Sequence, residues 1–202
     1  MSLGADEPRG FLGPLTGRTT TFMLDGREAN LGFAGLLMSQ LSQAHAPGII
    51  LDLDAFYSSN AGRVLSSMDP ATARATTIRV PDPGSDVEPE LSSLFGAQQG
   101  VIIVDSLNSL YHLISLEDGS SRSRKLAFAL ASLSYLARTN RKVVLLSMYR
   151  REGLYRSGTG RSISALSDST ASVEIRDGAI RIRGERSLAW PGGEFSSRIP
   201  SV

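Results

Sequence analysis

The first candidate for chemistry is a glycine-containing stretch that could bind a phosphate group. Residues 21–41, TFMLDGREANLGFAGLLMSQL, predict a strand, a loop bounded by Gly26 and Gly32, and an apolar helix. A phosphate-binding loop has this layout, because its glycines let backbone amides at the start of the helix approach the anion. We therefore expect any nucleotide to bind at Gly26, Arg27 and Gly32.

Two residue types that such a loop normally uses are missing. A lysine neutralises the β- and γ-phosphates and a Ser or Thr hydroxyl helps to hold Mg²⁺, but Phe33 and Ala34 stand at these positions. No lysine precedes Lys125, so no shift of the loop restores one. Either Arg27 replaces the lysine in an atypical loop that binds ATP and Mg²⁺, or the stretch is the relic of a nucleotide site. We expect the relic, with no cofactor and no metal.

Aspartates follow two buried strands and could contribute to the same site. The stretches IILDLDAF (49–56) and GVIIVDSLNSL (100–110) predict these strands, and they contain Asp54 and Asp105. Ligands bind outside the carboxyl ends of the strands in a parallel sheet, so both carboxylates are candidates for a ligand site. The alternative is that they hydrogen-bond to nearby loops at the strand ends.

An arginine-rich segment is the second candidate site. Residues 141–161 carry six basic side chains against Glu152 alone, a balance of +5 (6 − 1). Arginine pairs with phosphates and aromatic rings stack on unpaired bases, so the combination favours single-stranded nucleic acid. The alternatives are a solvated loop, or a loop that inserts into an acidic neighbouring subunit. The residues that we expect to bind are Tyr149, Arg150, Arg151, Tyr155, Arg156 and Arg161.

The two halves of the chain differ in charge. Residues 1–121 contain 6 basic and 14 acidic side chains, a balance of −8, whereas residues 122–202 contain 15 and 6, a balance of +9. Such a split favours an anionic partner for the second half, or self-association of unlike faces. The alternative is that the two halves interleave in space and their charges mix.

The composition restricts the remaining classes of function. The chain has 202 residues, of which 41% are hydrophobic and none is cysteine, so it lacks a disulfide framework and thiolate metal ligands. Its two histidines are far apart in sequence, which argues against a histidine-based metal centre. No apolar run approaches the length of a membrane span, so we expect a cytoplasmic protein with no membrane partner.

Strands and helices that alternate along the chain must position these residues. Apolar periodicity predicts helices over about 31–44 and 121–139, and a buried strand over 142–148. Aliphatic strands interleaved with helices predict a mostly parallel sheet flanked by helices on both faces. The segment 171–184, which contains an Asp-Gly turn, predicts an antiparallel hairpin at the edge of the sheet.

The order of these elements resembles the ATPase core of the RecA/RadA family. Residues 49–65, IILDLDAFYSSNAGRVL, are similar to the family strand that ends in an acidic pair, and residues 100–113 are similar to the Walker B strand. Residues 121–149 are similar to the helix and strand that follow. Residues 164–187, SALSDSTASVEIRDGAIRIRGERS, resemble the C-terminal strands of RadA and the related KaiC proteins.

The resemblance implies a domain organisation and roles for the aspartates. It covers residues 19–187, which form one RecA-like domain, with a flexible N-terminal segment over 1–18 and a C-terminal arm or tail over 188–202. Asp105 matches the Walker B aspartate. Asp54 matches the catalytic glutamate but is one methylene shorter, which puts a water-activating role in doubt.

Departures from the family pattern favour a protein that has lost ATP hydrolysis. Besides the incomplete phosphate loop and the short Asp54, Met148 and Tyr149 replace the polar pair that senses the γ-phosphate. In the family, the loop after this strand contacts single-stranded DNA. We expect an accessory or assembly subunit in DNA recombination or repair, similar to the recombinase paralogues, that binds single-stranded nucleic acid, a RecA-like protein partner or itself. The alternatives are an Elongator-type ring subunit that binds RNA, and an ATPase with an atypical phosphate loop.

Overall fold

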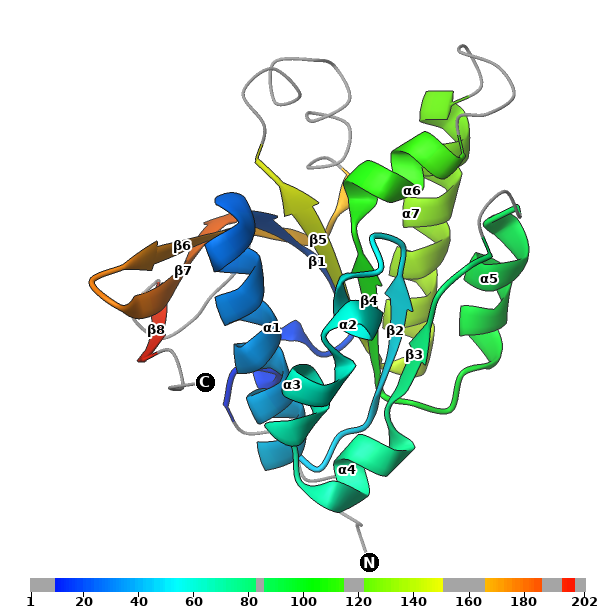
Figure 1. Cartoon of the computed structure of the whole chain (residues 1–202). Coiled ribbons are helices and arrows are strands. Elements are labelled where there is room, and N and C mark those ends of the chain that lie inside the picture. The colour runs from blue at the N-terminus through cyan, green and yellow to red at the C-terminus, as the bar shows by residue number, and fades with distance from the viewer. Residues whose placement is uncertain (1–9, 83–85, 115–121, 151–165, 187–193, 199–202) are drawn as a thin grey trace, which may run out of the picture.

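The structure is a computed structural model that describes residues 10–82, 86–114, 122–150, 166–186 and 194–198. Its centre is one eight-stranded sheet with the strand order β3-β2-β4-β5-β1-β6-β7-β8 (Figure 1). The first six strands of the chain pair in parallel, and the last two pairings are antiparallel. The strands are β1 Arg18–Leu24, β2 Gly48–Asp52, β3 Thr77–Arg79, β4 Val101–Asp105, β5 Val143–Tyr149, β6 Ser169–Arg176, β7 Ala179–Arg186 and β8 Glu194–Arg198.

Helices cover both faces of the sheet, as the sequence predicts. Figure 1 shows α1, α3 and α4 on one side of the strands and α5, α6 and α7 on the other. The described α-helices are α1 Gly26–Gln43, α2 Phe56–Ser59, α3 Ala61–Ser66, α4 Pro70–Ala75, α5 Glu88–Ser93, α6 Leu107–Leu113 and α7 Arg122–Asn140, and the 3-10 turns are Gly13–Leu15 and Leu94–Gly96.

The core has two layers because successive strand residues point to opposite faces. On β4, Ile103 packs with the helix α1 layer, whereas Ile102 and Val104 pack with the α7 layer. The same alternation divides Phe22 from Met23 on β1. Continuous apolar runs in the sequence therefore correspond to strands that are buried on both faces.

The N-terminal boundary differs from the prediction of a flexible segment over residues 1–18. Phe11, Leu12 and Leu15 are buried, and the Phe11 ring lies 5.9 Å from the ring of Phe22 and 5.2 Å from that of Phe195. Three large apolar side chains within five residues gain enough from burial to hold this short segment against the core. The packed structure therefore begins before residue 18.

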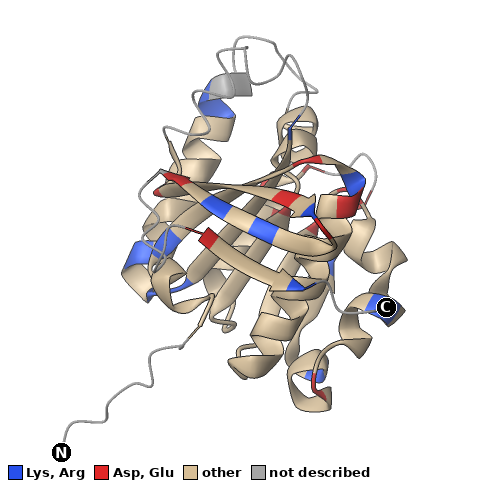
Figure 2. Cartoon of the chain, turned by 90° about the vertical axis from the view of Figure 1, so that its left-hand side faces the viewer, with Lys and Arg blue, Asp and Glu red and all other residues tan. Residues whose placement is uncertain are grey.

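The C-terminal hairpin is present, but it does not form the edge of the sheet by itself. Asp177 and Gly178 have φ values of 54° and 70°, as a two-residue hairpin turn requires. β8, within the predicted arm, pairs with β7 and becomes the outermost strand. Acidic and basic positions interleave over β6, β7 and β8 (Figure 2). On this edge Arg183 pairs with Glu194 at 3.6 Å, and both residues belong to the second half of the chain.

Candidate functional site at the carboxyl ends of the strands

Helix α1 begins almost immediately after strand β1, so the predicted loop over residues 26–32 is wrong. β1 ends at Leu24, Asp25 stands alone between the two elements, and α1 starts at Gly26. Gly26 has a φ of 88°, a conformation that glycine adopts without steric cost and that lets the chain turn sharply into the helix. The residues after it are mostly good helix formers, and no second glycine interrupts them before Gly32. Arg27 lies exposed in the first turn.

Gly32 and Phe33 serve the packing of α1. A Cβ atom on Gly32 would lie 3.3 Å from Ile175 Cδ1, so glycine allows α1 to approach β6 closely. Phe33 is 2% exposed, and its ring lies 4.6 Å from that of Phe22 on β1. Neither residue is placed as a phosphate-binding residue would be.

Asp54 connects the end of β2 to the start of α6. One carboxylate oxygen accepts a hydrogen bond from Ser106 Oγ at 2.7 Å, and the other accepts one from Ser109 Oγ. Ser106 Oγ in turn accepts from the backbone N–H of Ser109 at 3.4 Å and caps α6. Both carboxylate oxygens of Asp54 are therefore engaged by hydroxyl groups at a helix start, the arrangement expected of a strand-end hydrogen-bonding role.

Asp105 is fully buried at the end of β4. Its Oδ1 atom accepts a hydrogen bond from Ser147 Oγ on β5, and Oδ2 has no hydrogen-bond partner among the described residues. The pKa of Asp105 is raised to about 7, mainly by burial and in addition by the nearby carboxylates of Asp54 and Asp52, while the Ser147 hydrogen bond opposes the shift. A carboxyl group with this pKa is protonated in a large part of the molecules at neutral pH.

Tyr149 and Asn30 meet between the end of β5 and helix α1. The side-chain amide of Asn30 donates a hydrogen bond to the Tyr149 hydroxyl, and the backbone N–H of Tyr149 donates to Asn108 Oδ1 at 2.8 Å. Burial raises the pKa of Tyr149, and the carboxylates of Asp105 and Asp54 add to the shift. The tyrosine therefore stays protonated and occupies the position next to the aspartates.

Two residues of this cluster, Asn30 and Asn108, were not predicted from the sequence, whereas Asp52 belongs to the acidic pair expected at the end of β2. Asp52 accepts hydrogen bonds from the backbone N–H groups of Phe56 at 2.8 Å and Ser58 at 2.7 Å, and so fixes the start of α2. Asn30 is 1% exposed within an apolar helix face, and this polar residue at a buried helical spacing was the signal available for it. For Asn108, which lies in the stretch that the sequence predicts as a strand, no comparable signal exists.

Tyr57, in helix α2, also belongs to this cluster. Its side chain is 1% exposed, and burial raises the pKa of its hydroxyl well above the ordinary value. The charges of Asp105 and Asp52 raise it further, which places the ring close to both carboxylates. The two tyrosines thus stand as neutral groups beside the buried acids.

The basic candidate site is described only at its beginning. Arg150 pairs with Glu185 at 3.0 Å, and its backbone N–H donates to Leu24 O at 2.9 Å, so its first residues are tied to β1 and β7. The remaining residues predicted for this site lie outside the described part of the chain: Arg151, Tyr155, Arg156 and Arg161.

The described part of the chain also bears on metal ions and membranes. Within it, no group of three or more aspartate, glutamate or histidine side chains is arranged to hold a metal ion. None of the helices that the structure describes has the length and apolar character needed to cross a membrane.

The comparisons with known proteins bear on the fold. No protein-family model and no curated protein matches the sequence. Among solved structures, the chain is similar to the crystal structure of the RadB recombinase, with a TM-score of 0.64 and 14% sequence identity over 92% of this chain and 88% of that chain. At this identity the similarity shows the fold alone. The RecA-like fold predicted from the sequence is confirmed.

Proposed function

We propose that this chain is a RecA-like subunit that does not hydrolyse ATP and acts as an accessory or assembly subunit, in the manner of a recombinase paralogue. Its partner is single-stranded nucleic acid or a RecA-like protein, bound through the basic segment that begins at Tyr149. The main observation in support of the proposal is that α1 starts at Gly26, with only one residue between it and the end of β1.

The short β1–α1 connection supports the loss of nucleotide binding. A phosphate loop places several residues between strand and helix, and their amides surround the anion. Here Asp25 is the whole connection, and Glu28 lies in the first turn of α1. The free amides at the helix start favour an anion, but the two carboxylates repel a polyphosphate at close range.

The hydrogen bonds of Asp54 and Tyr149 and the raised pKa of Asp105 also support the absence of ATP hydrolysis. Both oxygens of Asp54 accept hydrogen bonds from serines, which favours a structural role for this carboxylate at the start of α6. A buried Asp105 with a pKa raised to about 7 is a weak partner for Mg²⁺ at neutral pH. Tyr149, at the family's sensor position, is engaged with Asn30.

Titration with Mg-ATP in a calorimeter tests the proposal. We expect no saturable heat at millimolar nucleotide and no release of phosphate over hours, with thermal unfolding confirming that the protein is folded. Saturable heat that disappears in Arg27→Ala, but persists in the matched surface variant Arg63→Ala, would establish the atypical phosphate loop instead.

A further inference from the structure

Helix α7 has two apolar faces, and one of them points to solvent. The inner face packs on the sheet through Leu126, Leu130 and Leu133. On the outer face, Phe128 is 77% exposed and Tyr135 is 66% exposed, the two highest values among the large hydrophobic residues in the described ranges. Exposed aromatic residues that gather on one face of a monomer usually mark a contact surface.

The outer residues of α7 follow a heptad-like spacing. The row, which we call the α7 outer row, consists of Arg124, Phe128, Ala131, Tyr135 and Arg138, all exposed and spaced by four, three, four and three residues. This is the spacing of a helix seam that packs against another helix. Its two ends are cationic and its centre is apolar, over about 21 Å of helix at 1.5 Å per residue.

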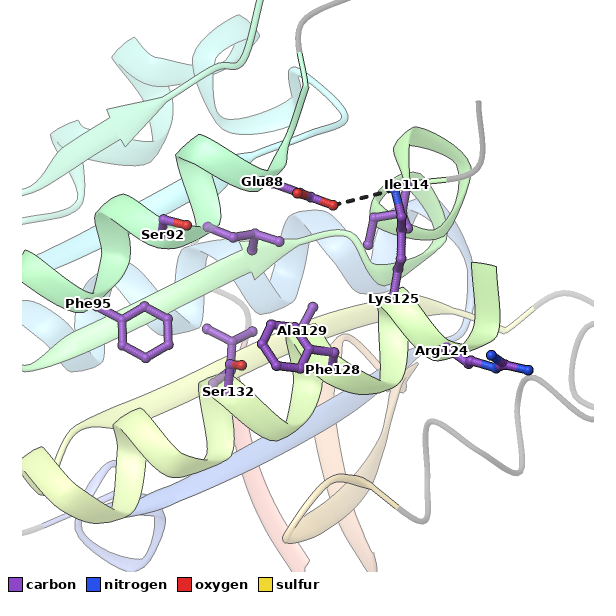
Figure 3. A pocket seen from close by; sticks show the side chains of 11 residues that line it. Glu88, Ser92, Phe95, Ile114, Arg124, Lys125, Phe128, Ala129 and Ser132 are labelled. Atoms are coloured by element: carbon purple, nitrogen blue, oxygen red, sulfur yellow. Dashed lines mark ion pairs between the residues drawn. The ribbon is translucent and has the colours of Figure 1, made fainter. Parts of the chain in front are cut away.

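A groove between α5 and α7 extends this surface. It has a volume of about 380 Å³, and its apolar lining comes from Leu91, Phe95, Ile114, Phe128, Ala129 and Leu133 (Figure 3). Phe95 is itself 43% exposed. The ion pair between Lys125 and Glu88, at 3.5 Å, joins the two helices beside it (Figure 3). The groove and the outer row share Phe128, so one ligand can contact both.

The charges of the row indicate which ligand fits. Two copies of α7 packed antiparallel about Ala131 would bring Arg124 of one copy against Arg138 of the other, and parallel packing would bring identical arginines together. Like charges that face each other disfavour such a dimer. Arg138 pairs with Asp168 but keeps 67% of its side chain exposed, so it can contact a second carboxylate.

We propose that the α7 outer row and the α5–α7 groove bind an amphipathic helix of a partner protein. That helix carries large apolar residues at heptad spacing, which pack on Phe128 and Tyr135 and reach into the groove. Acidic residues at each end of its apolar stripe pair with Arg124 and Arg138. This surface lies on the opposite face of the sheet from α1, so it does not depend on nucleotide or on the basic segment.

The test uses the full chain and two synthetic helical peptides. Both carry a stripe of leucines at heptad spacing over three turns, and they differ only in having Glu or Lys at the two ends of the stripe. Fluorescence anisotropy should show saturable binding of the Glu peptide and at least about tenfold weaker binding of the Lys peptide. Phe128→Ser should weaken the Glu peptide by about tenfold or more, as expected of a central aromatic contact.

Two variants control the result. Val80→Ser removes another exposed apolar residue, which directly follows β3 and is 49% exposed, and it should leave the affinity unchanged. Arg124→Glu should reverse the preference towards the Lys peptide. The proposal is overturned if neither peptide binds at 1 mM or so, far above the affinity of specific complexes, or if Phe128→Ser and Arg124→Glu change nothing. Light scattering that shows self-association abolished by Phe128→Ser would overturn it in favour of a second copy.

Discussion

At the scale of single residues, the burial of Asp105 has a direct consequence for how the stability of the protein depends on pH. A carboxyl group loses most of its hydration when it is buried, and among the described residues only the Ser147 hydroxyl compensates this carboxylate with a hydrogen bond. The folded state therefore prefers the protonated acid, with a pKa of about 7 against an ordinary value of 3.8. Because the folded state binds the proton more tightly than the unfolded state, the contribution of Asp105 to stability is greatest below pH 4 and decreases as the pH rises to about 7.

Asp105→Asn should therefore stabilise the protein at alkaline pH. Asparagine keeps an oxygen that can accept from Ser147 and has no charge to bury. Urea unfolding at pH 8 should show a free energy of unfolding higher by up to about 4 kcal/mol, from a pKa shift of roughly three units. At pH 4 the gain should vanish. The control is Asp177→Asn, whose carboxylate is 84% exposed and should give no such pH dependence. A gain that is equal at both pH values would contradict the burial argument.

At the scale of elements, the junction of β1 and α1 decides whether a nucleotide site exists. The sequence has glycines at both ends of the stretch 26–32, and their number and spacing predicted a loop. In the structure the two glycines have different structural roles. Gly26 makes the turn with a φ of 88°, and Gly32 lets α1 approach Ile175. Glycine spacing alone cannot distinguish these uses from a phosphate loop, because both require a residue without a side chain.

Two matched glycine variants on α1 should have opposite effects. Gly26→Ala forces a Cβ into a left-handed conformation and should lower the free energy of unfolding by about 1–2 kcal/mol. Gly35→Ala meets no atom within 4 Å and should raise it by up to about 1 kcal/mol, because alanine favours the helix. Urea denaturation followed by circular dichroism measures both. A neutral Gly26→Ala variant would show that residue 26 belongs to a loop that can relax.

At the scale of the whole molecule, the mostly parallel sheet and the burial of its strands could be predicted from the sequence, but the site's contacts could not. Aliphatic runs that end in aspartate identified β2 and β4, and the two-faced burial followed from their composition. Asn30 and Tyr149 are 119 residues apart, and no local pattern predicts that their side chains meet. The prediction of a flexible N-terminal segment was also wrong for its three apolar residues, which lie beside two glycines. The sequence does not show that Phe195, far along the chain, packs against Phe11.

The charge distribution of the whole molecule yields a prediction about nucleic acid. Changing Arg150, Arg151 and Arg156 together to Ala should weaken binding of a single-stranded oligonucleotide by about tenfold or more, and should flatten the dependence of affinity on salt. The matched control removes three exposed arginines elsewhere, Arg63, Arg74 and Arg176. Fluorescence anisotropy with DNA and RNA of one sequence measures both variants, and tighter binding of RNA would favour the Elongator-type alternative.

If the arginine triple variant and its control lose affinity equally, the contact is a general charge effect. Affinity that does not depend on salt would also contradict binding through the basic segment. A protein partner of RecA-like type would then be the remaining ligand for this segment.

The position of β1 in the sheet has a consequence for the synthesis of the protein. β1 is the first strand to be made, and its two neighbours are β5 and β6, with Arg18 opposite Val143. At 5–20 residues per second, the ribosome needs roughly 6 to 25 s to reach β5 after β1 has been made. During that interval β1, which is buried in the folded protein, has both edges unpaired, which is the condition that favours aggregation. A chain of this topology therefore depends on protection of its nascent N-terminal half until the middle of the sheet can close.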